Sequence, residues 1–305
     1  MEFEPKGIDL AKIVVARKLT DIEFVMKKRL IDEQTAITRT LKKGTDGERT
    51  VSAHMRFKEN LARLMVDLPE DIEPIIGETL SCELVRPASL LIAFGGDDFF
   101  KYASQFVDDG YFIGINGDSR TSNGALASFN VESFTHLLPK LALGEFSFEE
   151  WTRLVASIDG KEIPELALSE IFIGSAFRKR SSKYSLEYED LKERLSNSGL
   201  LIATGTGSTG WYHAAASCEH REAEVFSRTA DEARFYTTEA FFGRLNASFP
   251  RRGSIRFGEN LAVTNTSHFP EILSIDSVSD YQFKRGMTAR VTISGSPLKV
   301  IVGEL

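Results

Sequence analysis

The sequence predicts an α/β domain followed by an all-β domain with the character of a sandwich. Strand-like and helix-like segments alternate over the first 145 residues, which is typical of a mostly parallel sheet covered by helices on both faces. From residue 146 to residue 305, short strand-like segments follow one another with few helices between them. Glycine-rich loops follow three of the strands, and they carry the candidate functional residues.

The first domain opens on a buried strand and then turns helical. Apolar residues spaced three or four apart predict helices after Thr20, which can cap the first of them, and around 57–64. A further helix is expected over 131–143, bent or divided by Pro139. The expected strands of this domain are 12–16, 89–94 and 111–116. This order favours a Rossmann-like α/β domain over 1–145.

The second domain, 146–305, reads as a series of strands separated by polar turns. Helical interruptions are expected after Gly207 and over 221–240. The last expected strand, 298–302, can return to the first domain. The expected strands lie within 151–159, 169–174, 183–189, 199–205, 254–265, 271–278, 290–294 and 298–302.

Composition excludes several classes of protein. Acids outnumber basic residues by 44 to 37, which gives a formal net charge of −7 and argues against broad binding to nucleic acid. Two distant cysteines fit neither a disulfide framework nor a zinc site. No apolar stretch approaches the ~20 residues of a membrane span, and the first residues do not resemble a secretory or transit peptide. We therefore expect a cytoplasmic protein that binds neither nucleic acid nor a membrane.

The first glycine loop is Gly95-Gly96-Asp97, between a strand and a helix-like segment. Glycines permit a tight turn, and backbone N–H groups at a helix start can bind an anion. An ordinary turn with an aspartate cap fits the same residues equally well. A second aspartate, Asp98, follows directly, and two adjacent negative charges at a phosphate site need an explanation.

The second loop opens at Asn116 and Gly117 and extends to residue 126. Carboxyl ends of neighbouring parallel strands meet at one edge of the sheet, and open α/β sheets bind ligands at that edge. An ordinary surface loop is the alternative. Two such loops after consecutive strands favour a functional role.

The third loop reads "TGTGSTGW" over 204–211 and contains the pattern G-x-G-x-x-G. We reject a Rossmann dinucleotide fingerprint, which needs a βαβ unit with an acid about 20 residues further on. Backbone N–H groups and side-chain hydroxyls remain as ligand contacts. The hydroxyls belong to Thr204, Thr206, Ser208 and Thr209.

Five motifs in this order, "GGD", "GIN", "SEI", "TGTGSTGW" and "SID", resemble those of the NAD kinases. These enzymes move the γ-phosphate of ATP to the adenosine-ribose 2′-hydroxyl of NAD. The resemblance spans 12–302 and points to the mitochondrial type and its bacterial relatives, which carry an Asn-x-Asp…Ser-x-Gly loop, here Asn116 to Gly124. It implies ATP and NAD as substrates, Mg²⁺, a site between an α/β and a β-rich domain, and a homo-oligomer, either a dimer or a tetramer.

The resemblance assigns roles to individual residues. Asp97 matches the aspartate that activates the ribose hydroxyl and helps to place Mg²⁺, and Glu170 matches the glutamate that grips NAD. A ribose hydroxyl is a poor nucleophile and needs such a base, while the γ-phosphate needs Mg²⁺ and basic groups. The expected nucleotide-binding residues are Gly95, Gly96, Asp98, Asn116, Ser169, Glu170, Arg180, Thr204, Thr206, Ser208, Thr209, Trp211 and Asp276.

The chain departs from the family pattern at four positions. Asp98 and Phe99 stand where the family has Gly-Thr after Gly-Gly-Asp. Ser169 replaces an asparagine, and Ser277 replaces the glycine after Asp276. If Asp98 faced the phosphates, like charges would repel. Three arrangements avoid this: Asp98 points away, it shares an extra Mg²⁺, or the site no longer transfers phosphate.

The sequence thus predicts a phosphotransferase that makes NADP from NAD. It leaves open NAD or NADH as acceptor and ATP or polyphosphate as donor. One alternative is a related protein that binds NAD or another nucleotide with little or no catalysis. Another is a lipid or diacylglycerol kinase, which shares the Gly-Gly-Asp turn, although the "TGTGSTGW" loop and Glu170 argue against it.

Overall fold

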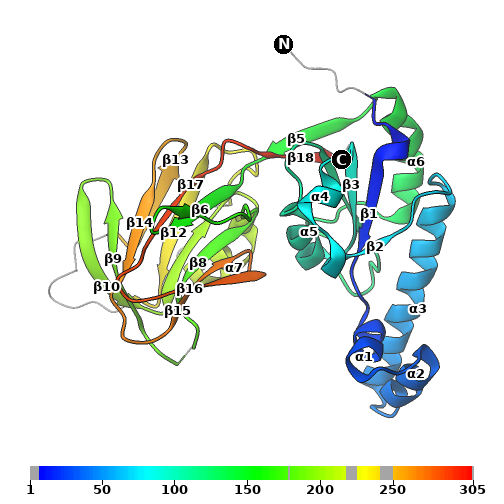
Figure 1. Cartoon of the computed structure of the whole chain (residues 1–305), viewed down its shortest axis with the longest axis horizontal. Helices are drawn as coiled ribbons and strands as arrows, with labels where there is room; N and C mark the ends of the chain where they lie inside the picture. Colours follow the sequence, from blue (N-terminus) through cyan, green and yellow to red (C-terminus); the bar gives the residue numbers. More distant parts are fainter. Residues whose placement is uncertain (1–6, 178, 218–224, 241–249, 304–305) are drawn as a thin grey trace. The chain divides into compact units, whose positions relative to one another are not determined.

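A computed structural model describes residues 7–177, 179–217, 225–240 and 250–303 (Figure 1). The chain divides into two compact units. Unit 1 comprises Met1–Glu149 and Lys299–Leu305, and unit 2 comprises Glu150–Leu298. The chain therefore enters unit 2 once and returns to unit 1 for its last strand.

Unit 1 is built on a six-stranded sheet with the order β2-β1-β3-β4-β18-β5. β1 pairs in parallel with β2 and β3, β3 pairs in parallel with β4, and β4 with β18. The strands are β1 (Ile13–Arg17), β2 (Ile75–Ile76), β3 (Leu90–Gly95), β4 (Tyr111–Asn116), β5 (Ser147–Trp151) and β18 (Leu298–Val302). Every residue of β3 is buried, which explains its unbroken apolar sequence.

Helices cover both faces of this sheet. Phe57 of α3 and Phe134 of α6 belong to one buried cluster with Ile92 of β3. On the other face the rings of Phe100 in α5 and Phe112 in β4 lie 4.6 Å apart. The helices are α1 (Asp21–Arg29), α2 (Glu33–Leu41), α3 (Thr45–Val66), α4 (Cys82–Val85), α5 (Asp97–Ser104) and α6 (Val131–Leu143).

Local signals explain where the helices begin and end. Thr20 caps α1 in a capping box with Glu23, as its sequence predicts. α6 begins after Asn130 and ends at Gly144, whose φ of 78° is the left-handed conformation that glycine favours. Pro139 does not divide α6, because the buried face of the helix holds the two parts together despite the missing N–H.

Unit 2 is a sandwich of two antiparallel six-stranded sheets. Their orders are β10-β9-β14-β17-β6-β7 and β13-β12-β11-β8-β15-β16. The strands are β6 (Leu154–Ile158), β7 (Lys161–Glu162), β8 (Glu170–Ser175), β9 (Ser182–Tyr188), β10 (Leu191–Asn197), β11 (Gly199–Ala203), β12 (Glu232–Thr238), β13 (Arg252–Arg256), β14 (Leu261–Asn265), β15 (Glu271–Ile275), β16 (Ser279–Phe283) and β17 (Thr288–Ile293). One helix, α7 (Trp211–Ser217), follows β11 in the described part of this unit.

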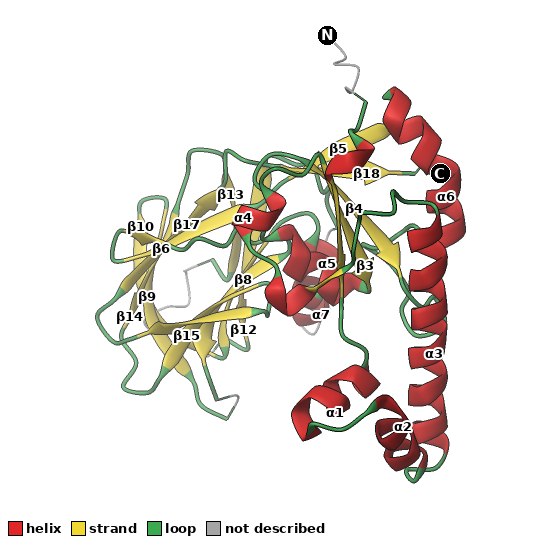
Figure 2. Ribbon diagram, turned by 45° about the vertical axis from the view of Figure 1, so that its right-hand side comes forward, coloured by secondary structure: helices red, strands yellow, loops and turns green. Residues whose placement is uncertain are grey.

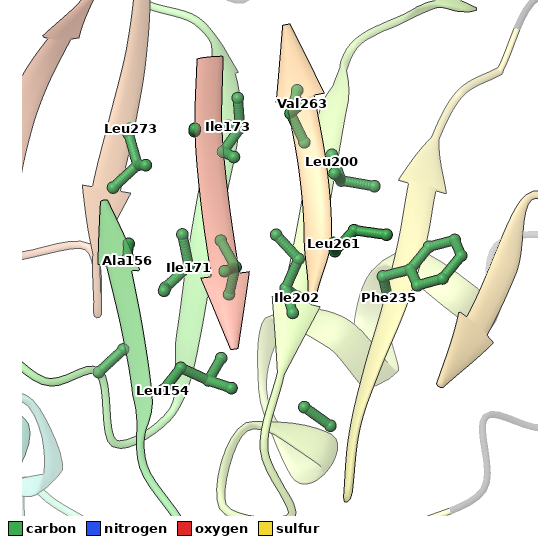
Figure 3. Packing of buried hydrophobic residues seen from close by; sticks show 14 of the residues in the cluster. Leu154, Ala156, Ile171, Ile173, Leu200, Ile202, Phe235, Leu261, Val263 and Leu273 are labelled. Atoms are coloured by element: carbon green, nitrogen blue, oxygen red, sulfur yellow. The ribbon is translucent and has the colours of Figure 1, made fainter. Parts of the chain in front are cut away.

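The two sheets of unit 2 share one hydrophobic core (Figure 3). Leu261 and Val263 of β14 come from one sheet, and Ile171 and Ile173 of β8 come from the other. Their spacing of two residues places each pair on the inner face of its strand. Figure 2 shows the helices gathered in unit 1 and the strands dominating unit 2. This architecture confirms the predicted fold class.

The predicted helix over 221–240 is wrong where the structure describes it, because Glu232–Thr238 forms β12. Ala233 and Phe235 alternate into the core, so the period of two prevails over helical propensity. Residues 218–224 lie outside the described ranges. Among the described residues, no helix has both the length and the apolar character that crossing a membrane requires.

Candidate functional site

The Gly-Gly-Asp turn joins β3 to α5, and side chains lie close to both of its glycines. A Cβ atom on Gly95 would lie 2.9 Å from Cβ and Cδ1 of Phe99. A Cβ atom on Gly96 would lie 3.0 Å from the Ser122 hydroxyl of the neighbouring loop. The ring of Phe99 therefore covers the turn at Gly95, where the family has a threonine in place of Phe99.

Asp97 ties this turn to the loop after β4. Its Oδ1 accepts hydrogen bonds from the backbone N–H of Leu126 at 2.8 Å and of Ala127 at 3.1 Å. Its Oδ2 accepts one from Ala125 N at 3.1 Å. An ionised carboxylate offers about four acceptor positions, so one position is left for a ligand. The carboxylate is only partly buried, which leaves that position accessible.

Asp98 faces solvent. Its side chain is 100% exposed, and its Oδ1 lies 3.4 Å from Nζ of Lys101, one turn further along α5. Of the three arrangements that would avoid repulsion at the turn, this geometry favours the one in which Asp98 points away. The adjacent negative charges are separated because Asp97 turns towards the loop after β4 and Asp98 towards Lys101.

Asn116 shapes the loop that Asp97 holds. Its side-chain amide donates to the Ser122 carbonyl at 3.0 Å, and its Oδ1 accepts from Asp118 N at 3.1 Å. Gly124 takes a left-handed φ of 66°, and a Cβ atom there would lie 2.8 Å from Nδ2 of Asn116. The residues of the Asn-x-Asp…Ser-x-Gly pattern thus build one compact turn at the carboxyl end of β4.

Neither Asp118 nor Arg56 is among the predicted site residues, yet they anchor the same loop. The guanidinium of Arg56 in α3 donates to both oxygens of Asp118, at 3.0 and 2.8 Å. Burial by itself raises the pKa of Asp118, but the hydrogen bonds from Arg56 and from the loop lower it below its ordinary value. No local sequence signal marks this pair, because Arg56 and Asp118 are 62 residues apart in the chain.

A second cluster lies in unit 2, where β8 begins and β15 ends. Asp276 is 1% exposed and takes a left-handed φ of 52°. Its Oδ1 accepts from Ser169 N at 2.7 Å and Glu170 N at 3.0 Å, and its Oδ2 accepts from Leu168 N at 2.8 Å. Burial, with the nearby charge of Glu170, raises the pKa of Asp276 to about 6 although the backbone N–H groups oppose the shift. Asp276 therefore fixes the backbone on which the predicted NAD-gripping residues sit.

Glu170 is the first residue of β8 and is 4% exposed. Its Oε1 accepts a long hydrogen bond of 3.4 Å from the hydroxyl of Ser277. Ser277 takes a left-handed φ of 59°, a conformation that the family's glycine adopts without strain. Ser169, which is 6% exposed, contributes its carbonyl to a 3.0 Å hydrogen bond from Thr204 N. The residue that precedes β8 and the start of the "TGTGSTGW" loop are thus in direct contact.

The glycines of that loop are also packing requirements. A Cβ atom on Gly205 would lie 1.8 Å from the Ser227 carbonyl oxygen, and one on Gly207 would lie 2.2 Å from that of Ser169. A Cβ atom on Gly210 would lie 3.6 Å from the Gly207 carbonyl oxygen, which is an ordinary contact, so packing does not require a glycine there. The pattern G-x-G-x-x-G arises here from close backbone packing inside a β-rich unit.

The hydroxyls of the loop divide into two groups. Those of Thr204 and Ser208 bond to carbonyl oxygens of Leu168 at 2.6 Å and Gly205 at 2.7 Å, so they stabilise the loop. The hydroxyl of Thr209 reaches the Thr206 carbonyl at 3.4 Å. The hydroxyl of Thr206 is buried and has no hydrogen-bond partner among the described residues. Thr206 is therefore the strongest ligand-contact candidate of the four.

Two aromatic or cationic candidates complete unit 2. Trp211 is 41% exposed, and its ring lies 5.0 Å from the ring of Phe172 in β8 with 30° between the planes. Arg180 lies beyond the opposite end of β8 from Glu170, with its guanidinium 4.2 Å from the ring centre of Phe269. The structure therefore groups Trp211 with the "TGTGSTGW" loop and places Arg180 away from the cluster around Glu170.

No protein-family model matches the chain. In sequence, it is 25% identical to the rat mitochondrial NAD kinase 2 over 256 residues, covering 67% of this chain and 60% of the rat protein. It is 24% identical over 178 residues to the NAD kinase of Methanopyrus kandleri, covering 55% of this chain and 63% of that protein. The alignments thus span about 60% of the length of these curated relatives.

Two solved structures with a similar fold are an NAD kinase and an NADH kinase. An NAD kinase from Archaeoglobus fulgidus in complex with ATP has a TM-score of 0.63 and 19% identity, over 96% of this chain and 94% of its own. A yeast NADH kinase complexed with NADH has a TM-score of 0.66 and 14% identity, over 98% of this chain and 84% of its own. The sequence relatives confirm the predicted resemblance of this chain to the NAD kinase family, and the structures confirm its fold.

Proposed function

We propose that this chain is an NAD kinase, which transfers the terminal phosphate of ATP or polyphosphate to the 2′-hydroxyl of NAD. The arrangement of Asp97 carries the proposal. It lies at the carboxyl end of a central parallel strand, partly accessible, and the backbone N–H groups of the next loop fix its orientation. The sequence similarity to NAD kinases supports the choice of substrates.

In the proposed reaction, Asp97 accepts the proton of the ribose 2′-hydroxyl. The hydroxyl oxygen forms a bond to the terminal phosphorus of the donor, and the bond from that phosphorus to the bridging oxygen breaks, so that ADP leaves when the donor is ATP. The proton passes from Asp97 to water. The hydrogen bonds from the backbone keep the carboxylate in one orientation, which aligns it with the nucleophile.

Glu170 and Thr206 would bind NAD in unit 2. A buried carboxylate such as Glu170 is costly unless it accepts hydrogen bonds, and ribose hydroxyls are suitable donors. The unpartnered hydroxyl of Thr206 offers a further contact. Exposed Trp211 adds an aromatic surface for a base or a nicotinamide ring. We keep Arg180 as a predicted contact to anionic groups, separate from this cluster.

Mg²⁺ also belongs to the proposal. The described residues contain no group of three or more His, Cys, Asp or Glu side chains arranged to hold a metal. Mg²⁺ often binds through one or two carboxylates, several waters and the phosphates of the substrate. The one free acceptor position of Asp97 would hold either this ion or the ribose hydroxyl, so in the proposed reaction the ion would rest mainly on waters and the donor phosphates. When bound, Mg²⁺ would neutralise charge on the donor phosphates.

Activity assays test the proposal directly. The purified chain with Mg²⁺ should form NADP from NAD when ATP or tripolyphosphate is the donor, and parallel reactions should contain NADH or diacylglycerol as acceptor. Product from diacylglycerol alone would assign the chain to the lipid kinases. The family resemblance further supports a homo-oligomer, which light scattering would measure, and the composition supports a cytoplasmic location, which fractionation would measure.

Glu170→Gln separates the NAD pocket from the donor site. The substitution should weaken NAD binding by about tenfold or more and leave ATP binding unchanged, because the charged acceptor is replaced by a neutral one. Glu271→Gln is a matched control, since Glu271 is also 4% exposed but begins β15, beside the opposite end of β8. Equal losses in both variants, measured by calorimetry, would remove Glu170 from the pocket.

A second candidate function is nucleotide binding without transfer. Three of the acceptor positions of Asp97 are already used by backbone N–H groups, an arrangement that also fits a positioning role without proton transfer. In this case NAD should bind with ordinary affinity while no NADP forms with any donor. Calorimetry and the activity assay on one preparation distinguish the two functions.

A further inference from the structure

Unit 1 contains a cavity that is separate from the Gly-Gly-Asp turn. Its volume is about 310 Å³, within the range of small-molecule sites. The β1–α1 loop, one face of α3 and the loop after β4 form its walls, and none of the lining residues belongs to Gly95–Asp98. The cavity lies in unit 1 alone, so it needs no contribution from unit 2.

The order of the strands places this cavity where open α/β sheets bind ligands. From β1 the chain crosses to β2 on one side, and β3 follows on the other side of β1. The strand order therefore reverses between β1 and β3, and the crevice outside their carboxyl ends is the expected ligand site. Lys18 stands at this point, because its backbone N–H continues the pairing with β3 at Phe94 O, 3.2 Å away.

Lys18 supplies a half-buried positive charge to the cavity. Its Nζ lies 5.8 Å from the ring centre of Phe57, and in the described ranges no carboxylate forms an ion pair with it. Arg49 adds a second cation at the rim, where it approaches Asp46 only to 4.0 Å. Two acids line the cavity: Asp118 is buried and paired with Arg56 by a bidentate contact, and Asp21, the first residue of α1, is exposed to solvent. The cations therefore remain available to a ligand.

The base of the cavity is a connected set of polar side chains. The hydroxyl of Thr20 lies 2.7 Å from Nδ1 of His54, which is 2% exposed. Nε2 of His54 lies 3.2 Å from Glu33, and Lys58 binds the same carboxylate at 2.8 Å. This chain of contacts joins the β1–α1 loop, which carries Lys18, to α2 and α3.

We propose that this cavity binds the phosphate chain of the phosphate donor, with Lys18 as the principal cation. The hydroxyls of Thr50 and Thr121 line the same space, but they already donate to the Asp46 carbonyl at 2.9 Å and to Oδ2 of Asp118 at 3.1 Å. Recognition of phosphate therefore rests on the two cations. This inference rests on the proposed function for the identity of the ligand. It adds a donor contact after β1 to the glycine turn after β3.

Lys18→Met tests the proposal, with Lys28→Met as a matched control. Nζ of Lys28 lies 5.9 Å from the Phe24 ring, a similar cation–ring contact, but Lys28 is outside the cavity. By calorimetry, Lys18→Met should weaken binding of both ATP and inorganic tripolyphosphate about tenfold to a hundredfold, and Lys28→Met should leave both unchanged. The loss should shrink in high salt, because screening weakens the charge interaction. NAD binding should stay the same in both variants.

A second variant fills the cavity without changing its charge. Ala53 lines the wall on α3, and Ala53→Leu should reduce tripolyphosphate binding by a similar factor while circular dichroism shows an intact fold. The proposal would be overturned if Lys18→Met bound tripolyphosphate with unchanged affinity, or if this variant lost affinity for adenosine alone. These binding measurements do not depend on turnover. If ATP binds through Lys18 but the wild-type chain forms no NADP, the proposed function fails and the phosphate site is still supported.

Discussion

Two aspartates, one in each unit, hold their surroundings with the same set of hydrogen bonds and differ in burial. Asp97 accepts bonds from the backbone N–H groups of three consecutive residues, Ala125 to Ala127. Asp276 accepts bonds from three consecutive residues as well, Leu168 to Glu170. Asp276 is 1% exposed, whereas Asp97 is only partly buried.

This difference in burial shows that a hydrogen-bond pattern does not by itself identify a catalytic carboxylate. Each aspartate locks a loop, and each matches a motif of the NAD kinase family. Only Asp97 can reach a substrate, because solvent has access to its remaining acceptor position. Under the proposed function, the comparison favours Asp97 for proton transfer and Asp276 for loop architecture, and the following experiments test both proposals.

Asp97→Asn should have the largest effect. Loss of the general base is expected to lower NADP formation by about 10²–10⁴-fold. The fold should survive, because the amide still accepts some of the backbone bonds, each worth about 1 kcal/mol. Turnover at saturating NAD and ATP measures the loss.

The control for this variant is Asp109→Asn, which alters a carboxylate at the opposite edge of the same sheet, where it pairs with Lys299 at 2.6 Å. Asp109→Asn should keep normal turnover. Near wild-type turnover in Asp97→Asn would instead reduce Asp97 to the same architectural role as Asp276.

Asp276 should make the free energy of unfolding depend on pH. Burial raises its pKa in the folded chain to about 6, above the ordinary value of 3.8, so the folded state binds the proton more tightly than the unfolded state. Its contribution to the free energy of unfolding is therefore fully present below about pH 4 and is lost as the pH rises through about 6. A shift of this size corresponds to about 3 kcal/mol.

Urea unfolding of wild type and Asp276→Asn from pH 4 to pH 7 measures this contribution. Trp211 lies in unit 2, and the ring of Trp151, which ends β5 at the border of the two units, lies 4.4 Å from the guanidinium of Arg228 in unit 2, so tryptophan fluorescence reports on this unit. The stability advantage of wild type over the variant should fall with rising pH. A difference that does not change with pH would contradict a raised pKa at Asp276.

The fold was predictable from sequence to the extent that periodicity was clear. The buried run of β3 and the alternation of β8 gave correct strands, and Thr20 marked the start of α1. β12 was mistaken for helix because charged residues precede it and the alternation of Ala233 and Phe235 spans only a few positions. β10 was missed because most of its residues are exposed or half-buried, and no apolar face marks it.

The candidate site was predictable only as a set of motifs. The sequence placed Asp97 and Asn116 at one sheet edge, and the structure joins their loops. It could not show that Phe99 fills the space above Gly95, because this contact depends on the rotamer of Phe99. It could not show that Arg56 pairs with Asp118 either, because these residues are distant in sequence. The cavity beside Lys18 was missed for the same reason.

Ser277→Gly should have a smaller effect, confined to stability. The left-handed φ of 59° costs a residue with a Cβ atom about 1 kcal/mol relative to glycine, so the substitution should stabilise unit 2 by about that amount. The lost hydrogen bond to Glu170 is long, at 3.4 Å, and should offset little of the gain.

Glu189→Gly is the matched control, because Glu189 has a φ of 53° in the β9–β10 turn of the same unit. Equal gains in both variants, measured by urea unfolding, would show that only backbone strain is relieved. A loss of stability in Ser277→Gly alone would mean that the serine hydroxyl supports the Asp276 turn.

Asp98→Gly should have the smallest effect. This substitution tests why two aspartates, Asp97 and Asp98, stand side by side in the turn. The side chain of Asp98 is fully exposed and lies beside Lys101, so it does not confront a ligand that approaches Asp97. Removing its charge should therefore change ATP affinity and NADP formation by less than about threefold, because exposed charges are well screened. Asp98→Asn separates charge from the backbone freedom that glycine adds, and both variants should behave alike. A tenfold rise in activity would show that Asp98 repels the donor and would contradict the geometry in which Asp98 points away from it. A tenfold fall that added magnesium restores would make Asp98 a metal ligand, and the two aspartates of this turn would then work as a pair.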